Sequence, residues 1–171
     1  SVASINNLQL PISKKFSFVA SVRNYPRNFV NIHSNGFGES SGTRNEIGFY
    51  GGIRWRSDFG TVNFYYDQFK FPYATYDLPI PTKGNEFLVD YSVTPFIKTK
   101  FYLRYKNETK EDLEIDEDSR TLYTRSKHNI RTEIRYDVFK NVTLKTRVEF
   151  VILYKTGIGK KENGVLVYQD L

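Results

Sequence analysis

Apolar and polar residues alternate one by one through most of this chain, and this period of two limits its fold more than any other feature. From Val142 to Tyr154 the even positions hold Val, Leu, Thr, Val, Phe, Ile and Tyr, whereas Lys145, Arg147 and Glu149 occupy odd positions. A β-strand separates these two sets onto opposite faces, while a helix would scatter the charges into the apolar stripe. The segment is therefore predicted to be a strand with one apolar face and one charged face.

Seven other segments repeat the pattern. They are residues 16–23, 47–56, 62–67, 87–93, 100–106, 130–138 and 165–168. The sequence thus predicts eight strands. Extended to the expected links on either side, most of them are about 9 to 12 residues long, close to the roughly 9–11 residues that a tilted strand needs to cross a bilayer. The longest apolar run has only five residues, from Phe150 to Tyr154, so a membrane-spanning helix of about 20 residues is excluded.

The links between these strands give a second argument for a membrane barrel. Residues 57–60, 95–97 and 140–141 form short links, whereas 25–45, 70–85, 107–127 and 155–163 form longer ones. Short turns on the periplasmic side and longer loops on the outer side are typical of outer-membrane barrels. We therefore expect long and short links to alternate along the whole chain.

Aromatic residues are unusually frequent, with 13 Tyr, 14 Phe and one Trp. Many lie near expected strand ends, which suggests the two aromatic belts of a membrane barrel. Phe16, Trp55, Phe96, Phe101 and Phe139 fall on the short-link side, and Tyr25, Phe49, Phe71, Phe87 and Tyr154 on the long-link side. The alternative is that Phe and Tyr are simply common in strands.

The charged faces carry more basic than acidic residues. The residues expected to face a lumen are Arg54, Arg56, Lys100, Arg104, Arg131, Glu133, Arg135, Lys145, Arg147 and Glu149, together with Arg23, Lys106, Asp67, Asp90 and Asp137. One interpretation is a basic lumen that favours anions or polyanions. The other is a ladder of Arg–Glu pairs that fills the interior, which the neighbouring charges on 131–135 and 145–149 favour.

Several short stretches resemble a known group of proteins. They are Arg23-Asn24-Tyr25, residues 35–40, 45–50, 62–67, 71–73 and 101–105. They are similar to the barrel portion of outer-membrane proteins of Bacteroidota and Ignavibacteria that carry the description helix-hairpin-helix domain-containing. The resemblance implies a barrel whose chain continues past residue 170 into further strands. The helix-hairpin-helix part is not among these residues, so no nucleic-acid partner is expected from this segment.

Three patterns associated with catalysis or metal binding are weak. Gly38-Glu39-Ser40-Ser41-Gly42 matches the nucleophile motif of hydrolases, but a polar loop and a strand surround it where a strand and a helix are required. His33 and His128 are the only histidines, too few for a His-based metal site. The acidic run 108–118 lacks the glycine and glutamate spacing of a calcium loop, so a solvated loop is the simpler interpretation.

The sequence thus predicts an all-β, antiparallel up-and-down transmembrane β-barrel, of which residues 1–171 form an incomplete segment of about eight strands. We expect a porin-like, non-enzymatic protein of the outer membrane, without cofactor, catalytic or metal site, that acts as a channel, a receptor or a subunit of an envelope complex. Its expected partners are membrane lipid and other outer-membrane or periplasmic proteins. The alternative is a soluble β-barrel that binds an acidic ligand or nucleic acid through its basic, aromatic-rich strands.

Overall fold

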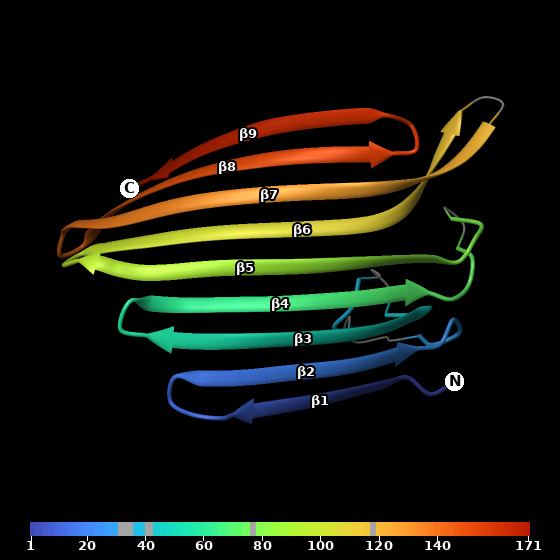
Figure 1. Ribbon diagram of the computed structural model, residues 1–171, viewed down its shortest axis with the longest axis horizontal. Helices are drawn as coiled ribbons and strands as arrows, with labels where there is room; N and C mark the ends of the chain where they lie inside the picture. Colours follow the sequence, from blue (N-terminus) through green and yellow to red (C-terminus); the bar gives the residue numbers. More distant parts are fainter. Residues whose placement is uncertain (31–35, 40–42, 76–77, 117–118) are drawn as a thin grey trace.

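The protein is one antiparallel sheet of nine strands in sequence order, as a computed structural model shows for residues 1–30, 36–39, 43–75, 78–116 and 119–171 (Figure 1). The strands are β1 (Ser4–Pro11), β2 (Phe16–Tyr25), β3 (Glu46–Ser57), β4 (Gly60–Phe71), β5 (Thr82–Phe96), β6 (Thr99–Asp116), β7 (Ser119–Phe139), β8 (Val142–Thr156) and β9 (Lys160–Asp170). The all-β, up-and-down arrangement predicted from the sequence is confirmed. The described residues contain no helix long and apolar enough to cross a membrane.

The sheet is open. β2 pairs with β1 and β3, and β9 pairs with β8 alone, so the described strands do not close into a barrel. Nine strands are present where eight were expected. The additional strand is β1, which is exposed along its whole length and paired only with β2. Its terminal Pro11 suits an edge, where a missing N–H disturbs no ladder.

All links at one end of the sheet are short, as expected for three of them. Residues 58–59, 97–98 and 140–141 separate β3 from β4, β5 from β6 and β7 from β8, on the left in Figure 1. Positive φ angles of Gly60 and Lys98 turn the chain there. We call this side the short-turn end, and the opposite side, which holds the other links, the loop end.

The expected alternation of link lengths is wrong at two places of the loop end. The links 26–45 and 72–81 are long, but β6 and β7 remain paired from Thr99 with Tyr136 to Asp116 with Ser119, and only residues 157–159 join β8 to β9. The segment 107–127 is therefore mostly a two-stranded ribbon that extends past its neighbours (Figure 1). Cross-strand pairs explain the difference, because the side chains of Glu108 and Arg125 meet at 3.2 Å and Tyr123 donates a hydrogen bond to Asp112.

The two faces of the sheet differ sharply. The polar face carries Arg23, Arg54, Asp67, Asp90, Arg104, Arg131 and Glu149, and the apolar face carries Phe18, Phe49, Ile53, Phe64, Val89, Leu103, Ile130 and Phe150. Among the described strand residues, every buried one except Asn107 lies on the polar face. The apolar face is exposed: 48% of Phe150, 51% of Trp55 and 68% of Val167 are accessible.

Two expected belt residues do not lie on the apolar face. Tyr25 and Phe71 follow the alternation of the polar face, because Tyr25 is paired with Glu46 and Phe71 with Thr82. The Tyr25 ring is buried and its hydroxyl donates a hydrogen bond of 2.8 Å to the carbonyl oxygen of Phe37. Their place near a strand end suggested a belt, but the parity of each position decides which face it occupies.

Candidate functional site: the charged face of the sheet

The polar face gathers the charged side chains of all inner strands into rows that run across the sheet. Because residues paired in register lie side by side on one face, one row can be followed through the whole ladder. It consists of Ser17, Arg54, Asn63, Asp90, Arg104, Arg131, Glu149 and Leu166. The register places on this face all the charged residues that the sequence predicted to share one, which are Arg54, Arg56, Lys100, Arg104, Arg131, Glu133, Arg135, Lys145, Arg147 and Glu149, together with Arg23, Lys106, Asp67, Asp90 and Asp137.

A ladder of ion pairs occupies β7 and β8. Glu133 accepts Arg135 Nε at 2.7 Å and Arg147 at 2.9 Å, and Lys145 Nζ lies 3.9 Å away. Glu149 accepts Arg131 Nε at 2.8 Å and Asn129 Nδ2 at 2.6 Å. Two carboxylates therefore neutralise part of the positive charge on these strands, and three basic side chains share Glu133.

The basic side chains on β6 lie outside this ladder. Within the part of the chain that the structure describes, Lys100 and Arg104 have no carboxylate at ion-pair distance. Arg104 is paired in register with Asp90, but Asp90 accepts a hydrogen bond from Asn63 instead, at 2.7 Å. The Arg104 guanidinium lies over the ring of Tyr102 at 5.2 Å. Arg104 Nε and the Tyr102 hydroxyl are both buried and have no hydrogen-bond partner among the described residues.

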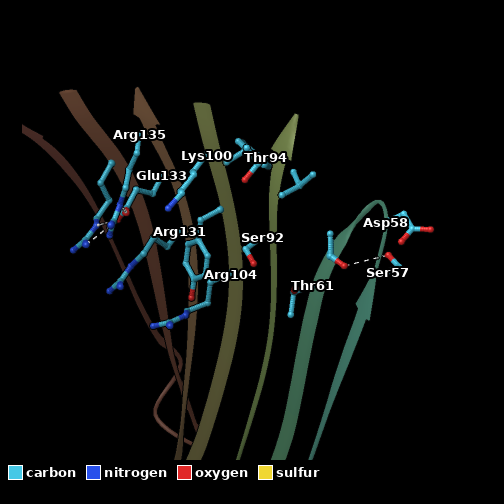
Figure 2. A pocket seen from close by; sticks show the side chains of 15 residues that line it. Ser57, Asp58, Thr61, Ser92, Thr94, Lys100, Arg104, Arg131, Glu133 and Arg135 are labelled. Carbon is cyan, nitrogen blue, oxygen red and sulfur yellow. Dashed lines mark hydrogen bonds and ion pairs between the residues drawn. The ribbon is translucent and has the colours of Figure 1, made fainter. Parts of the chain in front are cut away.

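These side chains border a groove on the polar face, at the short-turn end. The groove has a volume of about 680 Å³ and lies between Ser57, Thr61 and Ser92 on one side and Lys100, Arg104 and Arg131 on the other. Figure 2 shows Lys100, Arg104 and Arg131 reaching into the same space. The groove is thus open, polar and predominantly basic.

A second charged cluster is fully buried near the loop end of β2, β3 and β4. The Arg23 side chain is 0% exposed, and its Nε donates to Glu46 at 2.5 Å while its other nitrogens hold Asp67 at 2.8 and 3.1 Å. This two-sided arrangement satisfies the guanidinium with two carboxylates. The sequence indicated that Arg23 and Asp67 share a face, but it did not identify Glu46. The one available signal was that Glu46, Arg54 and Arg56 all occupy even positions of the same strand, which places their side chains on the same face.

Residues 36–39 fold over this buried cluster. The Glu39 N–H donates to the Glu46 carboxylate at 2.9 Å, and the Arg23 guanidinium lies 5.1 Å from the centre of the Phe37 ring. Phe37 also packs edge-on against Tyr50, and the Glu39 carboxylate binds Lys110 of β6 at 2.8 Å. The cluster therefore fixes part of the link 26–45 against the polar face, over the strands shown as β3 and β4 in Figure 1.

Gly48 provides a test of this packing. A Cβ atom at Gly48 would overlap the Arg23 guanidinium, whereas a Cβ at Gly164 would meet nothing within 4 Å. We expect Gly48→Ala to lower the free energy of unfolding by about 1–3 kcal/mol, since overpacking of that size is typical. Urea unfolding followed by circular dichroism measures it. Gly164→Ala is the matched control, and equal stability of the two variants would contradict the buried placement of Arg23.

Polar residues also cluster on the apolar face where it approaches the loop end. His128 Nδ1 lies 2.8 Å from the Tyr105 hydroxyl and 3.2 Å from Asn107 Nδ2, and its Nε2 lies 3.4 Å from Ser126 Oγ. Asn107 Nδ2 is also 3.3 Å from Ser126 Oγ, so the amide and the hydroxyl lie on the same side of the ring. In the catalytic triad of a hydrolase, the hydroxyl and the group that orients the histidine lie at opposite ends of the imidazole ring, next to different ring nitrogens. His33 and the Ser40 motif lie outside the described residues.

Two residues of the acidic run, Glu108 and Glu114, contact cations on β6, β7 and β9, where the sequence suggested a solvated loop. Glu108 contacts Lys110 and Arg125, both at 3.2 Å, and Glu114 contacts Lys160 at 2.6 Å. In the same ribbon, burial raises the pKa of the Tyr123 phenol and the Asp112 carboxylate raises it further.

Among the described residues, no group of three or more His, Cys, Asp or Glu side chains is placed to bind a metal ion. No protein-family model, curated protein or solved structure matches the chain.

Proposed function

We propose that the nine strands form part of the wall of an outer-membrane β-barrel, with the apolar face in lipid and the polar face lining an aqueous interior. In this proposal the protein has no enzymatic role and acts as a channel or receptor, or as a subunit of an envelope complex. The resemblance to barrel proteins of Bacteroidota and Ignavibacteria supports the same assignment. The proposal rests chiefly on one observation, the inverted distribution of polar and apolar side chains.

Buried polar side chains together with exposed apolar side chains are not expected for a sheet with water on both faces. The buried side chains include Arg23, Glu46, Asp67 and Glu133, whereas Phe150, Val165 and Val167 are about half exposed or more. A soluble sheet buries its apolar face, and contiguous apolar patches of more than a few hundred Å² on a protein surface mark contact with a partner or a membrane. In a barrel wall both observations follow directly from the lipid outside and the water inside.

The apolar band also has the height that a bilayer needs. On β8 it runs from Leu144 through Val148 and Phe150 to Tyr154, and on β7 it runs from Tyr136 to Ile130. The stretch on β8 spans 11 residues, in agreement with the roughly 9–11 residues of a tilted crossing, and the stretch on β7 is shorter, at seven residues. Above them the same face becomes polar at Asn107, Ser126 and His128, next to the rings of Tyr105 and Tyr154. The aromatic rings therefore lie at the edge of the band, where a membrane interface is expected.

Both edges of the sheet need further strands in this proposal, because unpaired backbone groups are not tolerated in lipid. β1 and β9 run in the same direction, since eight antiparallel pairings separate them (Figure 1). Joining β1 to β9 directly, or to a second copy around an axis normal to the membrane, would produce a parallel seam. A barrel with antiparallel seams only therefore requires an odd number of additional strands.

Membrane association can be tested by flotation. We expect the protein to require detergent for solubility and to float with lipid vesicles in a density gradient after detergent removal, resisting extraction by carbonate. Repeating the flotation in 1 M salt distinguishes insertion from surface adsorption, because salt screens the attraction of basic residues to lipid head groups. Inserted protein still floats under these conditions, whereas adsorbed protein is released. A monodisperse protein in plain buffer that does not float would instead support the soluble barrel that binds an acidic ligand.

A further inference from the structure

We propose that Lys100 and Arg104, with Arg131 beside them, form a binding site for a small divalent oxyanion, best represented by phosphate or a phosphorylated solute. The site lies in the groove of the polar face between β5 and β7. This site rests on the proposed function in one respect only, namely that the polar face is in contact with water. It assigns a chemical class of solute to the interior that the barrel would enclose.

The first argument is the local excess of positive charge. Glu133 is shared by Arg135, Arg147 and Lys145, and Glu149 is occupied by Arg131 and Asn129. No carboxylate of the described residues lies at ion-pair distance from Lys100 or Arg104. Asp90, the register partner of Arg104, accepts a hydrogen bond from Asn63, and Asp58 lies 3.3 Å from Lys15. Two neighbouring cations that contact no carboxylate favour the binding of an anion.

The second argument is the unfulfilled hydrogen-bonding capacity of the groove wall. Arg104 Nε and the Tyr102 hydroxyl are buried without a hydrogen-bond partner among the described residues. Buried polar groups are rarely left in this state, and a charged donor without a partner is costly. An oxyanion in the groove would supply a counter-charge to the Arg104 guanidinium, although not a direct partner for its buried Nε. The guanidinium is already held over the Tyr102 ring at 5.2 Å, so little side-chain freedom is lost on binding.

The third argument is the size and chemistry of the groove. Its volume of about 680 Å³ lies in the range of small-molecule sites. Opposite the basic side chains, Thr61 and Ser92 provide hydroxyl groups that can donate to the remaining oxygen atoms of a phosphate (Figure 2). A long polyanion is less suitable, because toward the loop end the cations Lys106, Lys110 and Arg125 of the polar face are already paired with Glu86 and Glu108.

Binding of inorganic phosphate to the protein in detergent micelles tests the site. Isothermal titration calorimetry in 100 mM chloride should show saturable binding of one phosphate per chain. Arg104→Gln and Lys100→Gln should each weaken binding by about ten- to hundredfold, since a hydrogen bond between charged groups has that effect. Arg56→Gln is the matched control: it removes the same charge from the same face outside the groove, and should change affinity less than about twofold.

Each result decides the question. No saturable binding by the unmodified protein would overturn the site, and so would an equal loss in Arg56→Gln, which would show a diffuse electrostatic field. If Arg104→Gln fails to fold by circular dichroism, Lys100→Gln decides alone, because its side chain is exposed. The measurement is independent of vesicle flotation. Phosphate binding without flotation would support the site and contradict the membrane assignment. Flotation without phosphate binding would support the membrane assignment and contradict the site.

Discussion

Replacing Arg23 by methionine should lower the free energy of unfolding by about 3–5 kcal/mol, one of the two largest effects expected in this protein. The substitution leaves Glu46 and Asp67 buried without the cation that both contact, and Glu46 is 0% exposed. Removing one partner of a buried ion pair is costly because the remaining charge loses both water and its partner. Urea unfolding of the protein in lipid vesicles, followed by tryptophan fluorescence, measures the difference.

Two controls define the cause of this loss. Arg56→Met removes an exposed basic side chain from the same face and should change stability by less than about 0.5 kcal/mol. The triple variant Arg23→Met, Glu46→Gln, Asp67→Asn removes all three charges together and should be more stable than Arg23→Met alone. A loss below about 1 kcal/mol for Arg23→Met would contradict the buried cluster.

Placing an arginine at Val148 should cost about 2–4 kcal/mol if the apolar face meets lipid near the middle of the bilayer. Val148 lies on that face between Thr132 and Val167, within the band of β8. Leu103→Arg, two strands away in the same row, should have a similar cost. The physical reason is that a guanidinium loses its hydration in the hydrocarbon region. Reversible urea unfolding in vesicles measures both variants.

Val151→Arg is the matched control for Val148→Arg. Both valines belong to β8 and are half-buried, but Val151 lies on the polar face opposite Asn129 and Gly164. Gly164 leaves free space there, so an arginine at position 151 should cost less than about 1 kcal/mol. Equal costs at both positions would show that the two faces have the same environment, which contradicts the assignment of lipid to one of them.

The alternation of residues predicts the strands of this protein well because it is a local property of each segment. From residue 16 onward every expected strand is present, and the parity of each charged residue correctly indicates the shared face. The pattern is too short to identify β1, because only Leu8 and Leu10 continue the apolar face and Asn6 interrupts it. Edge strands are held by backbone pairing with a neighbour, and the sequence of β1 alone contains little trace of it.

The ribbon of β6 and β7 escaped prediction for a different reason. Its acidic residues suggest a solvated loop when they are considered one after another. Their partners Arg125 and Lys160 are distant in the sequence and become neighbours only when the register is known. The same holds for the Arg23 cluster, whose three side chains come from three strands. Parity fixes the face of a side chain, but register fixes its contacts.

Quenching of Trp55 by brominated lipids tests the central claim, that the apolar face lies in lipid, most directly. Trp55 is the only tryptophan of the chain, lies on the apolar face and is 51% exposed. In vesicles its emission should shift to shorter wavelength, and phosphatidylcholine brominated on its acyl chains should quench most of it. A variant with Trp55→Phe and Tyr102→Trp, which moves the fluorophore to the polar face, should show little quenching by the same lipid. Strong quenching of Trp55 with little quenching at position 102 is the result this account predicts. Equal quenching at both positions, or none at Trp55, would contradict it.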